Sequence, residues 1–317
     1  MTTKDKYKEK FCDNKDIYVF FQPWWLDTVC NEMWDVLKAC DGANNEAYMP
    51  IHVYKKYGIT SIRPPAFTPY CGIIYESETD EKLHTKYKLE NDICECFATS
   101  IDKMKLDACF YTFKPEFFCA TPFVQHGFSA ELRYTYRINI ADMDTCFENF
   151  SKTLRKKLRK CFDSLVCETE NYDLRQLYGI LHQVYAKQNK PVPYSFELYQ
   201  SVVENSLQNN QGQMFVVKDK QGNVNSHLFV IWDNKACYAL IGANDQSYLQ
   251  NNAGIYAQYL SMTFAHNMGI KQYDTEGSML KGVEEYFMQF SGIRTPYIYI
   301  TKYYNNIYKS LRTLLKK

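Results

Sequence analysis

The pattern of apolar and polar residues changes its period along the chain, and these changes predict a mixed α/β protein. Strands are predicted where apolar residues alternate with polar ones, or where β-branched and aromatic residues cluster: 16–21, 34–39, 48–55, 58–63, 107–113, 131–140, 165–169, 213–217, 224–233, 235–242, 273–276 and 296–302. Helices are predicted at 82–103, 142–164, 174–188, 196–209, 254–268 and 303–315. Pro23 opens a further short helix, because proline fits the first helical turn.

Residues 273–292 combine a strand, a turn and a short helix. Asp274 and Glu276 alternate with uncharged residues, so on a strand both carboxylates point to the same face. Gly277 follows directly and lets the backbone turn or approach another group closely. Two interpretations are open: a reactive site at the end of a strand, or a strand end whose acids are solvated.

The predicted helix at 142–164 carries a run of basic residues with no acid among them. Leu154, Leu158 and Cys161 form an apolar stripe on this helix, so the basic residues share its outer face. Such a face is either simply solvated or a binding surface for an anion, such as a phosphate, a coenzyme or an RNA backbone. The basic residues are Lys152, Arg155, Lys156, Lys157, Arg159 and Lys160.

A second candidate anion site lies where the helix at 254–268 begins. Asn251, Asn252, Ala253 and Gly254 form a polar, glycine-bearing start to this helix. Successive backbone N–H groups at such a start attract phosphate, since the helix leaves them unpaired. A plain helix start without a ligand is the alternative interpretation.

Composition and charge narrow the class of protein. A chain of 317 residues favours two domains over one. The formal net charge of +1 gives no overall field that favours nucleic acid or membrane. The first ten residues are polar and no membrane-spanning apolar run follows, so we expect a soluble cytoplasmic protein. The 12 cysteines and six histidines show no metal-ligand or catalytic spacing, so no metal is expected.

Residues 274–292 resemble the signature D-F-E-G-S-M…G-hydrophobic-E-x-F-F-x-x-F-G. The matching segments are 274–279, 282–285 and 287–292. This signature belongs to GNAT-like proteins related to the Fem-type aminoacyltransferases and the BioF2-like acetyltransferases. The resemblance implies tandem GNAT-like domains, each a mostly antiparallel mixed sheet flanked by helices. It places the first domain at 1–148 and the second domain, which contains the site, at 149–302. Residues 303–317 are expected to pack on the first domain.

The same resemblance implies an N-acyltransferase that moves an acetyl or aminoacyl group from a carrier to an amine. The carrier is acyl-CoA or aminoacyl-tRNA, and the acceptor is a small molecule or a peptide. Such a reaction needs a base, a proton donor and a site for the carrier's phosphates. We expect Glu276 or Asp274 to act as the base and Tyr256 or Tyr286 to act as the proton donor. The phosphates of the carrier are expected at Asn251, Asn252 and Gly254. Lys152 and Arg155 are the expected contacts for an anion.

One position departs from the family pattern. The aminoacyl-transferring Fem enzymes have a lysine where this chain has Met288, and this difference disfavours aminoacyl-tRNA as the donor. The helix start at 251–254 is also a degraded version of the GNAT phosphate loop. Two further hypotheses therefore remain: a catalytically silent GNAT-fold binding protein, and an RNA- or tRNA-binding protein that uses the basic face at 152–160.

Overall fold

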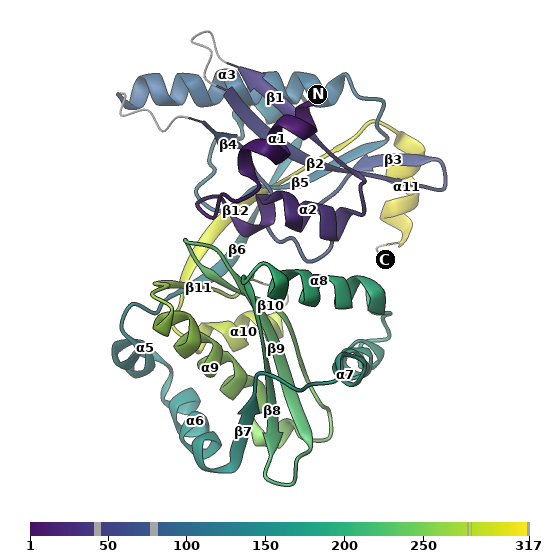
Figure 1. Ribbon diagram of the computed structural model, residues 1–317. Helices are drawn as coiled ribbons and strands as arrows, with labels where there is room; N and C mark the ends of the chain where they lie inside the picture. Colours follow the sequence, from purple (N-terminus) through teal and green to yellow (C-terminus); the bar gives the residue numbers. More distant parts are fainter. Residues whose placement is uncertain (41–45, 77–81, 278, 280, 316–317) are drawn as a thin grey trace. The chain divides into compact units, whose positions relative to one another are not determined.

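The computed structural model describes residues 1–40, 46–76, 82–277, 279 and 281–315 (Figure 1). The chain divides into two compact units. Unit 1 comprises residues 1–133 and 296–317, and unit 2 comprises residues 134–295. The C-terminal segment thus belongs to the same unit as the N-terminal part of the chain. The domain boundaries expected after residues 148 and 302 remain a prediction.

Unit 1 is a mostly antiparallel sheet with helices. Its strands follow one another in the order β1, β2, β3, β5 and β12, and β4 pairs with β2; the β3–β5 pair is parallel. The strands are β1 (Trp34–Cys40), β2 (Glu46–Lys56), β3 (Ile59–Ile62), β4 (Ile74–Tyr75), β5 (Ala108–Thr112) and β12 (Ile293–Tyr303), whose first three residues belong to unit 2. The helices are α1 (Thr3–Phe11), α2 (Pro23–Cys30), α3 (Leu83–Asp102), α4 (Thr121–Gln125) and α11 (Asn306–Leu315).

Unit 2 contains the larger helical part of the chain. Its strands lie in the order β6, β11, β10, β9, β8 and β7, and the β10–β11 pair is parallel. The strands are β6 (Ser129–Asn139), which begins in unit 1, β7 (Leu165–Glu168), β8 (Gly212–Asp219), β9 (Val224–Trp232), β10 (Cys237–Asn244) and β11 (Gln272–Asp274). The helices are α5 (Met143–Asn149), α6 (Lys152–Ser164), α7 (Leu174–Lys187), α8 (Phe196–Gln208), α9 (Ala253–Asn267) and α10 (Lys281–Met288).

Helices cover both faces of the sheet in unit 2 (Figure 1). On one face, Met262 and Ala265 of α9 pack with Leu158 of α6 and with Val217 and Val230 of the sheet. Helices α7 and α8 cover the other face, where α8 contacts β8 and α7 contacts β10. Successive residues of β8 and β9 are buried almost without interruption, because they point to opposite faces of the sheet and helices cover both faces. The predicted class, an α/β protein with a mostly antiparallel mixed sheet flanked by helices, is confirmed.

Two predicted elements differ from the structure. The predicted strand at 16–21 is wrong, because Val19–Phe21 forms a single 3₁₀ turn. All three side chains of this turn are buried, and a compact turn inserts consecutive aromatic residues into a core without sheet pairing. The predicted helix at 142–164 is two helices, α5 and α6. The break lies at Ser151, whose hydroxyl accepts from the Leu154 N–H at 3.1 Å and so caps α6.

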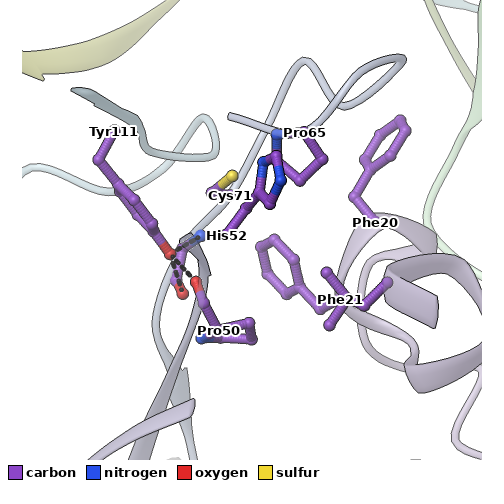
Figure 2. A pocket seen from close by; sticks show the side chains of 9 residues that line it. Phe20, Phe21, Pro50, His52, Pro65, Cys71 and Tyr111 are labelled. Carbon is purple, nitrogen blue, oxygen red and sulfur yellow. Dashed lines mark hydrogen bonds between the residues drawn. The ribbon is translucent and has the colours of Figure 1, made fainter. Parts of the chain in front are cut away.

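Unit 1 also encloses a small pocket between β2, the 3₁₀ turn and the segment before β4 (Figure 2). It has room for about one water molecule, about 10 Å³, and its walls include Phe20, Phe21 and Cys71. His52 lines it, and both ring nitrogens of His52 are buried with no hydrogen-bond partner among the residues that the structure describes. Burial lowers the pKa of His52, so the imidazole is neutral at pH 7. None of the predicted site residues lines this pocket.

A charged network joins α3, α4 and β12 in unit 1. The His126 ring contacts Asp102 Oδ2 through Nδ1 at 2.8 Å and Glu95 Oε1 through Nε2 at 2.7 Å. The Lys302 ammonium donates to Asp102 Oδ1 at 2.5 Å, and the Tyr304 hydroxyl donates to the same oxygen at 2.6 Å. Hydrogen bonds to Glu95 and then to Asp102 raise the pKa of His126. The ring therefore ties the end of α4 to α3, and its contacts with the two carboxylates favour the protonated form.

We predict that His126→Gln destabilises the protein at about pH 6 by roughly 0.5–1 kcal/mol, and by less at about pH 8. A histidine with a raised folded-state pKa stabilises the fold below its unfolded pKa, and this contribution is lost as the pH rises through the folded value. Urea unfolding at both pH values measures the difference. His84→Gln, on the exposed start of α3, is the control. If His126→Gln lowers the free energy of unfolding equally at both pH values, the raised pKa of His126 is contradicted.

Candidate functional site

Asp274 is the last residue of β11 and is completely buried. Its Oδ1 accepts from the Thr135 hydroxyl at 2.5 Å and from the Glu276 N–H at 2.8 Å. Its Oδ2 accepts from Arg137 Nε at 3.1 Å. Burial raises the pKa of Asp274, while Arg137 and Thr135 act in the opposite direction. With both oxygens engaged, this carboxyl holds the end of β11 on β6 and fixes the turn that follows.

The turn after β11 corrects one prediction. The strand ends at Asp274, so the strand alternation that predicted a shared face does not extend to Glu276. Instead Glu276 and Gly277 both have left-handed backbones, with φ of +58° and +67°. A left-handed conformation is strained for glutamate and is tolerated where the surroundings enforce it. The turn is fixed to β6, because the Thr275 N–H donates to the Tyr136 carbonyl at 3.1 Å.

Gly277 is required by the close approach of this turn to β6. A Cβ atom at this position would lie 2.1 Å from the Tyr134 carbonyl oxygen and 2.9 Å from Thr135 Cα. Both neighbours are backbone atoms and have no room to move away. The turn therefore reaches its position only with glycine. Ser278, which also belongs to the motif, lies outside the described residues.

Glu276 is partly exposed as a residue, but its Oε1 is buried and has no hydrogen-bond partner in the part of the chain that the structure describes. Burial and then the neighbouring Asp274 charge raise the pKa of Glu276 well above its ordinary value. The interpretation of two solvated acids is therefore wrong. A buried carboxyl oxygen without a partner is costly in a folded protein and indicates a functional position.

Two tyrosines, Tyr273 of β11 and Tyr286 of α10, lie close enough to each other to interact electrostatically. The Tyr273 hydroxyl bonds to the Ser261 hydroxyl at 2.7 Å. Burial raises the pKa of Tyr273, and Tyr286 and Glu276 act on it in the same direction. The Tyr286 hydroxyl points to the start of α9 and donates to the Gly254 carbonyl at 3.4 Å. Tyr256 instead packs against Phe162 of α6, with 5.9 Å between ring centroids. Tyr286 thus connects α10 to the start of α9, whereas Tyr256 packs on α6.

The two parallel strands beside the turn diverge. β10 pairs with β11 through only two residues, Cys237 with Tyr273 and Tyr238 with Asp274. β10 continues to Asn244 and changes register against β9 between Ala239 and Ile241. Within the described residues, the edge of β10 beyond Tyr238 therefore has no pairing with β11. Backbone groups along this edge remain for another extended molecule to bind.

The end of β10 meets the start of α9. A Cβ atom on Gly254 would lie 2.2 Å from Asn244 Oδ1, so the glycine lets the strand end approach the helix closely. Asn252 is the N-cap of α9 and has a left-handed backbone with φ +58°. The Asn251 side chain donates to Asn225 Oδ1 at 2.6 Å. The predicted residues at 251–254 thus form an ordered helix start, and Asn244 and Asn225 are partners that sequence reasoning missed.

The basic helix α6 reaches α9 through its C-terminal half. The Cys161 thiol lies 3.5 Å from the Asn251 carbonyl oxygen. Lys152 is exposed at the other end of α6, about 14 Å away at 1.5 Å per residue. Arg155 pairs with Glu148 of α5. Lys157 and Lys160, which precede Cys161 closely, are therefore nearer along the helix to the α9 start than are the two predicted contacts.

Arg294 is a further residue that sequence reasoning missed. Its guanidinium donates to Glu284 Oε1 at 3.0 Å and to the Tyr136 hydroxyl at 3.2 Å. The same guanidinium lies 3.9 Å from the Met288 sulfur. A cation thus stands beside the position where the aminoacyl-transferring Fem enzymes have a lysine. The approach of Arg294 from β12 to α10 is a tertiary contact and leaves no signal in the local sequence.

Metal and membrane sites were also sought among the described residues. No group of three or more histidine, cysteine, aspartate or glutamate side chains is arranged there to hold a metal ion. No helix in the same ranges has both the length and the apolar character needed to cross a bilayer.

Comparison with known proteins gives a family for part of the chain. Residues 148–288 match the family described as "Acetyltransferase (GNAT) domain". No curated protein matches the chain by sequence. The matched segment contains α6, the diverging strands, α9 and the turn that carries Glu276.

Solved structures share the fold over nearly the whole chain at low identity. The structure titled "Crystal structure of FemX" is 12% identical with a TM-score of 0.65, and 98% of each chain is covered. The C-terminal domain of a putative lysylphosphatidylglycerol synthetase from Agrobacterium fabrum is 12% identical with a TM-score of 0.55, covering 98% of this chain and 95% of that one. A tandem GNAT protein from the clavulanic acid biosynthesis pathway is 6% identical with a TM-score of 0.51, covering 86% and 84%. Residues 148–288 therefore match the acetyltransferase (GNAT) domain family, and the chain shares its fold with these solved structures.

Proposed function

We propose that the protein is an N-acyltransferase that moves an acyl group from acyl-CoA to the amine of a small molecule or peptide. The observation that carries this proposal is the Glu276 carboxyl, which has a buried, unpartnered oxygen and a raised pKa beside the diverging strands β10 and β11. The family match at 148–288 supports acyl transfer as the reaction class.

Glu276 is the proposed base. An amine acceptor is protonated at neutral pH and must lose a proton before its nitrogen attacks the thioester carbonyl. A carboxylate whose pKa is raised toward neutrality accepts that proton more readily than an ordinary glutamate does. Asp274 has both oxygens occupied by donors, so we assign it the positioning of the turn. The C–N bond then forms as the C–S bond of the thioester breaks.

Tyr286 is the proposed proton donor to the leaving thiolate. Burial raises the pKa of Tyr286, so its hydroxyl remains protonated at pH 7. The hydroxyl bonds to Gly254 at the start of α9, on the side where the carrier would enter. Tyr256, the donor proposed from sequence, packs against α6, and we give it no role in proton transfer.

The carrier is proposed to lie along the open edge of β10, with its phosphates at the start of α9. The amide groups in the arm of coenzyme A match the unpaired backbone groups of a strand edge. The N–H of Gly254, in the first turn of α9, suits a pyrophosphate because the helix dipole favours negative charge there, whereas the N–H of the N-cap residue Asn252 already donates to the Leu249 carbonyl. Lys157 and Lys160 of α6 supply cations near the same helix start.

Aminoacyl-tRNA is the second candidate donor, and one observation favours it. Apart from Leu154, Leu158 and Cys161, the first ten residues of α6 present mainly cations to solvent. An RNA backbone would bind such a face with a steep dependence on salt concentration. A filter-binding titration with tRNA against salt separates the two donors, because a flat or absent response removes RNA. If the protein binds neither tRNA nor acyl-CoA, the hypothesis of a catalytically silent binding protein is favoured.

We predict that Glu276→Gln lowers kcat by about 10²–10³-fold with little change in KM, because it removes the base and leaves the shape of the site. In the unchanged protein the rate falls as the pH drops through the raised pKa of Glu276, and this limb disappears in the variant. The kinetic constants and the pH dependence are measured by the release of CoA from acetyl-CoA in the presence of a pool of amines. Glu285→Gln, on the exposed face of α10, is the matched control. Equal activity of the two variants would remove Glu276 from the reaction.

We predict that the double variant Lys157→Gln/Lys160→Gln weakens acetyl-CoA binding by about tenfold, since two cations near the carrier phosphates are lost. Isothermal titration gives the dissociation constants. Lys220→Gln, in the exposed β8–β9 turn, is the control for a general loss of charge. Lys152→Gln is expected to have a smaller effect than the double variant. A larger loss of acetyl-CoA affinity in Lys152→Gln than in the double variant would place the anion site at the N-terminal end of α6.

We predict that Gly277→Ala destabilises the protein by about 2–4 kcal/mol and abolishes activity, because its Cβ collides with the Tyr134 carbonyl and displaces Glu276. Urea unfolding and the CoA-release assay measure the two effects. Gly282→Ala is the matched control, since a Cβ there meets no atom within 4 Å. It is expected to change stability by less than about 1 kcal/mol. Similar stability of the two variants would show that the turn does not need glycine.

A further inference from the structure

The outer face of α11 in unit 1 carries an apolar stripe. Ile307, Leu311 and Leu314 are spaced at helical intervals, and their exposed fractions are 74%, 53% and 69%. The helix is attached to the unit by its other side. There the Tyr308 hydroxyl accepts from Arg63 Nη2 at 2.7 Å, and the Arg312 guanidinium lies 4.2 Å from the Phe110 ring centroid. The stripe is therefore not used to pack α11 onto unit 1.

Basic and aromatic residues lie at the same corner of unit 1. Asp107 joins the parts of this corner: its Oδ2 accepts from the Thr60 N–H of β3 at 2.8 Å, and its Oδ1 accepts from Asn305, just before α11, at 2.7 Å. The β2–β3 hairpin, whose tip is Lys55–Gly58, thus ends beside the start of α11 (Figure 1). The exposed residues of the tip are Lys55, Lys56 and Tyr57, and Tyr57 is 90% exposed.

Most of the charged residues named at this corner are cations. Lys105 is exposed in the loop that leads into Asp107, and Lys309 is exposed on α11. Asp107 is an acid here, and hydrogen bonds from Thr60 and Asn305 lower its pKa and hold its carboxylate in place. The sequence from 303 to 317 contains no acid and ends in two lysines, which lie outside the described residues. The corner therefore combines an aliphatic stripe, an exposed tyrosine and a set of cations.

We propose that this corner, made of α11 and the tip of the β2–β3 hairpin, docks onto the surface of a bilayer that contains anionic lipid. The apolar stripe enters the boundary between headgroups and acyl chains, the tyrosine lies at headgroup level, and the lysines contact the negative surface. An RNA partner would use the cations but has no need for an exposed aliphatic stripe. The proposal concerns unit 1 and does not depend on the proposed acyl transfer.

Vesicle flotation of the full chain tests the proposal. The protein is expected to float with vesicles of phosphatidylcholine mixed with phosphatidylglycerol, to float at least about tenfold less with phosphatidylcholine alone, and to be released by high salt. Ile307→Gln/Leu311→Gln/Leu314→Gln is expected to lower binding by at least about tenfold. Lys55→Gln/Lys56→Gln is expected to lower it several-fold. All the changed side chains are exposed, and circular dichroism verifies the fold.

The matched control is Leu83→Gln/Lys86→Gln/Lys88→Gln, which removes an exposed leucine and two lysines from the start of α3. This variant is expected to bind the mixed vesicles as well as the unchanged chain does. The proposal is overturned if the unchanged chain does not float with the mixed vesicles. It is also overturned if the α11 variant binds as well as the control, or if the corner binds an RNA oligonucleotide and no vesicle.

Discussion

The candidate site depends on the contact between a three-residue turn and the edge of β6. Asp274 collects donors from Thr135, Arg137 and the Glu276 backbone, and Gly277 rests on the Tyr134 carbonyl, where no side chain fits. These contacts hold Glu276 in a left-handed backbone. Among the described residues its Oε1 is buried without a partner, and this burial raises the pKa of the carboxyl above that of an exposed glutamate.

In the proposed function, the surrounding strands and helices would bring the carrier to this carboxyl. The parallel pairing of β10 with β11 is short, so one edge of β10 is open where the turn begins. The close approach of Gly254 to Asn244 brings the start of α9 to the end of that edge. A carrier along β10 would thus have its phosphates at a helix start and its reactive end near Glu276. Each of these features follows from a glycine or from a short strand, and none requires a metal or a conformational change.

Much of the fold was predictable because its signals are local. The strands β8 and β9 were predicted at 213–217 and 224–233, and in the turn between them Asp219 accepts from the Gln221 and Asn223 N–H groups. The helix α9 and its start at 251–254 were predicted in the same way. The predicted strand at 16–21 failed because buried aromatic residues suit a compact turn as well as a strand. The motif of the site and the candidate Tyr286 were predictable, but the partners Asn225 and Asn244 come from distant segments, and the contacts of Arg294 with Tyr136 and Glu284 need the tertiary structure.

The central claim is that Glu276 is a buried base with a raised pKa. A ¹³C NMR titration of the glutamate carboxyl carbons tests it directly, with the Glu276 signal assigned by its absence in Glu276→Gln. The account predicts that this signal titrates well above the ordinary glutamate pKa of about 4.3. A Glu276 signal that titrates at or below that value would contradict the account.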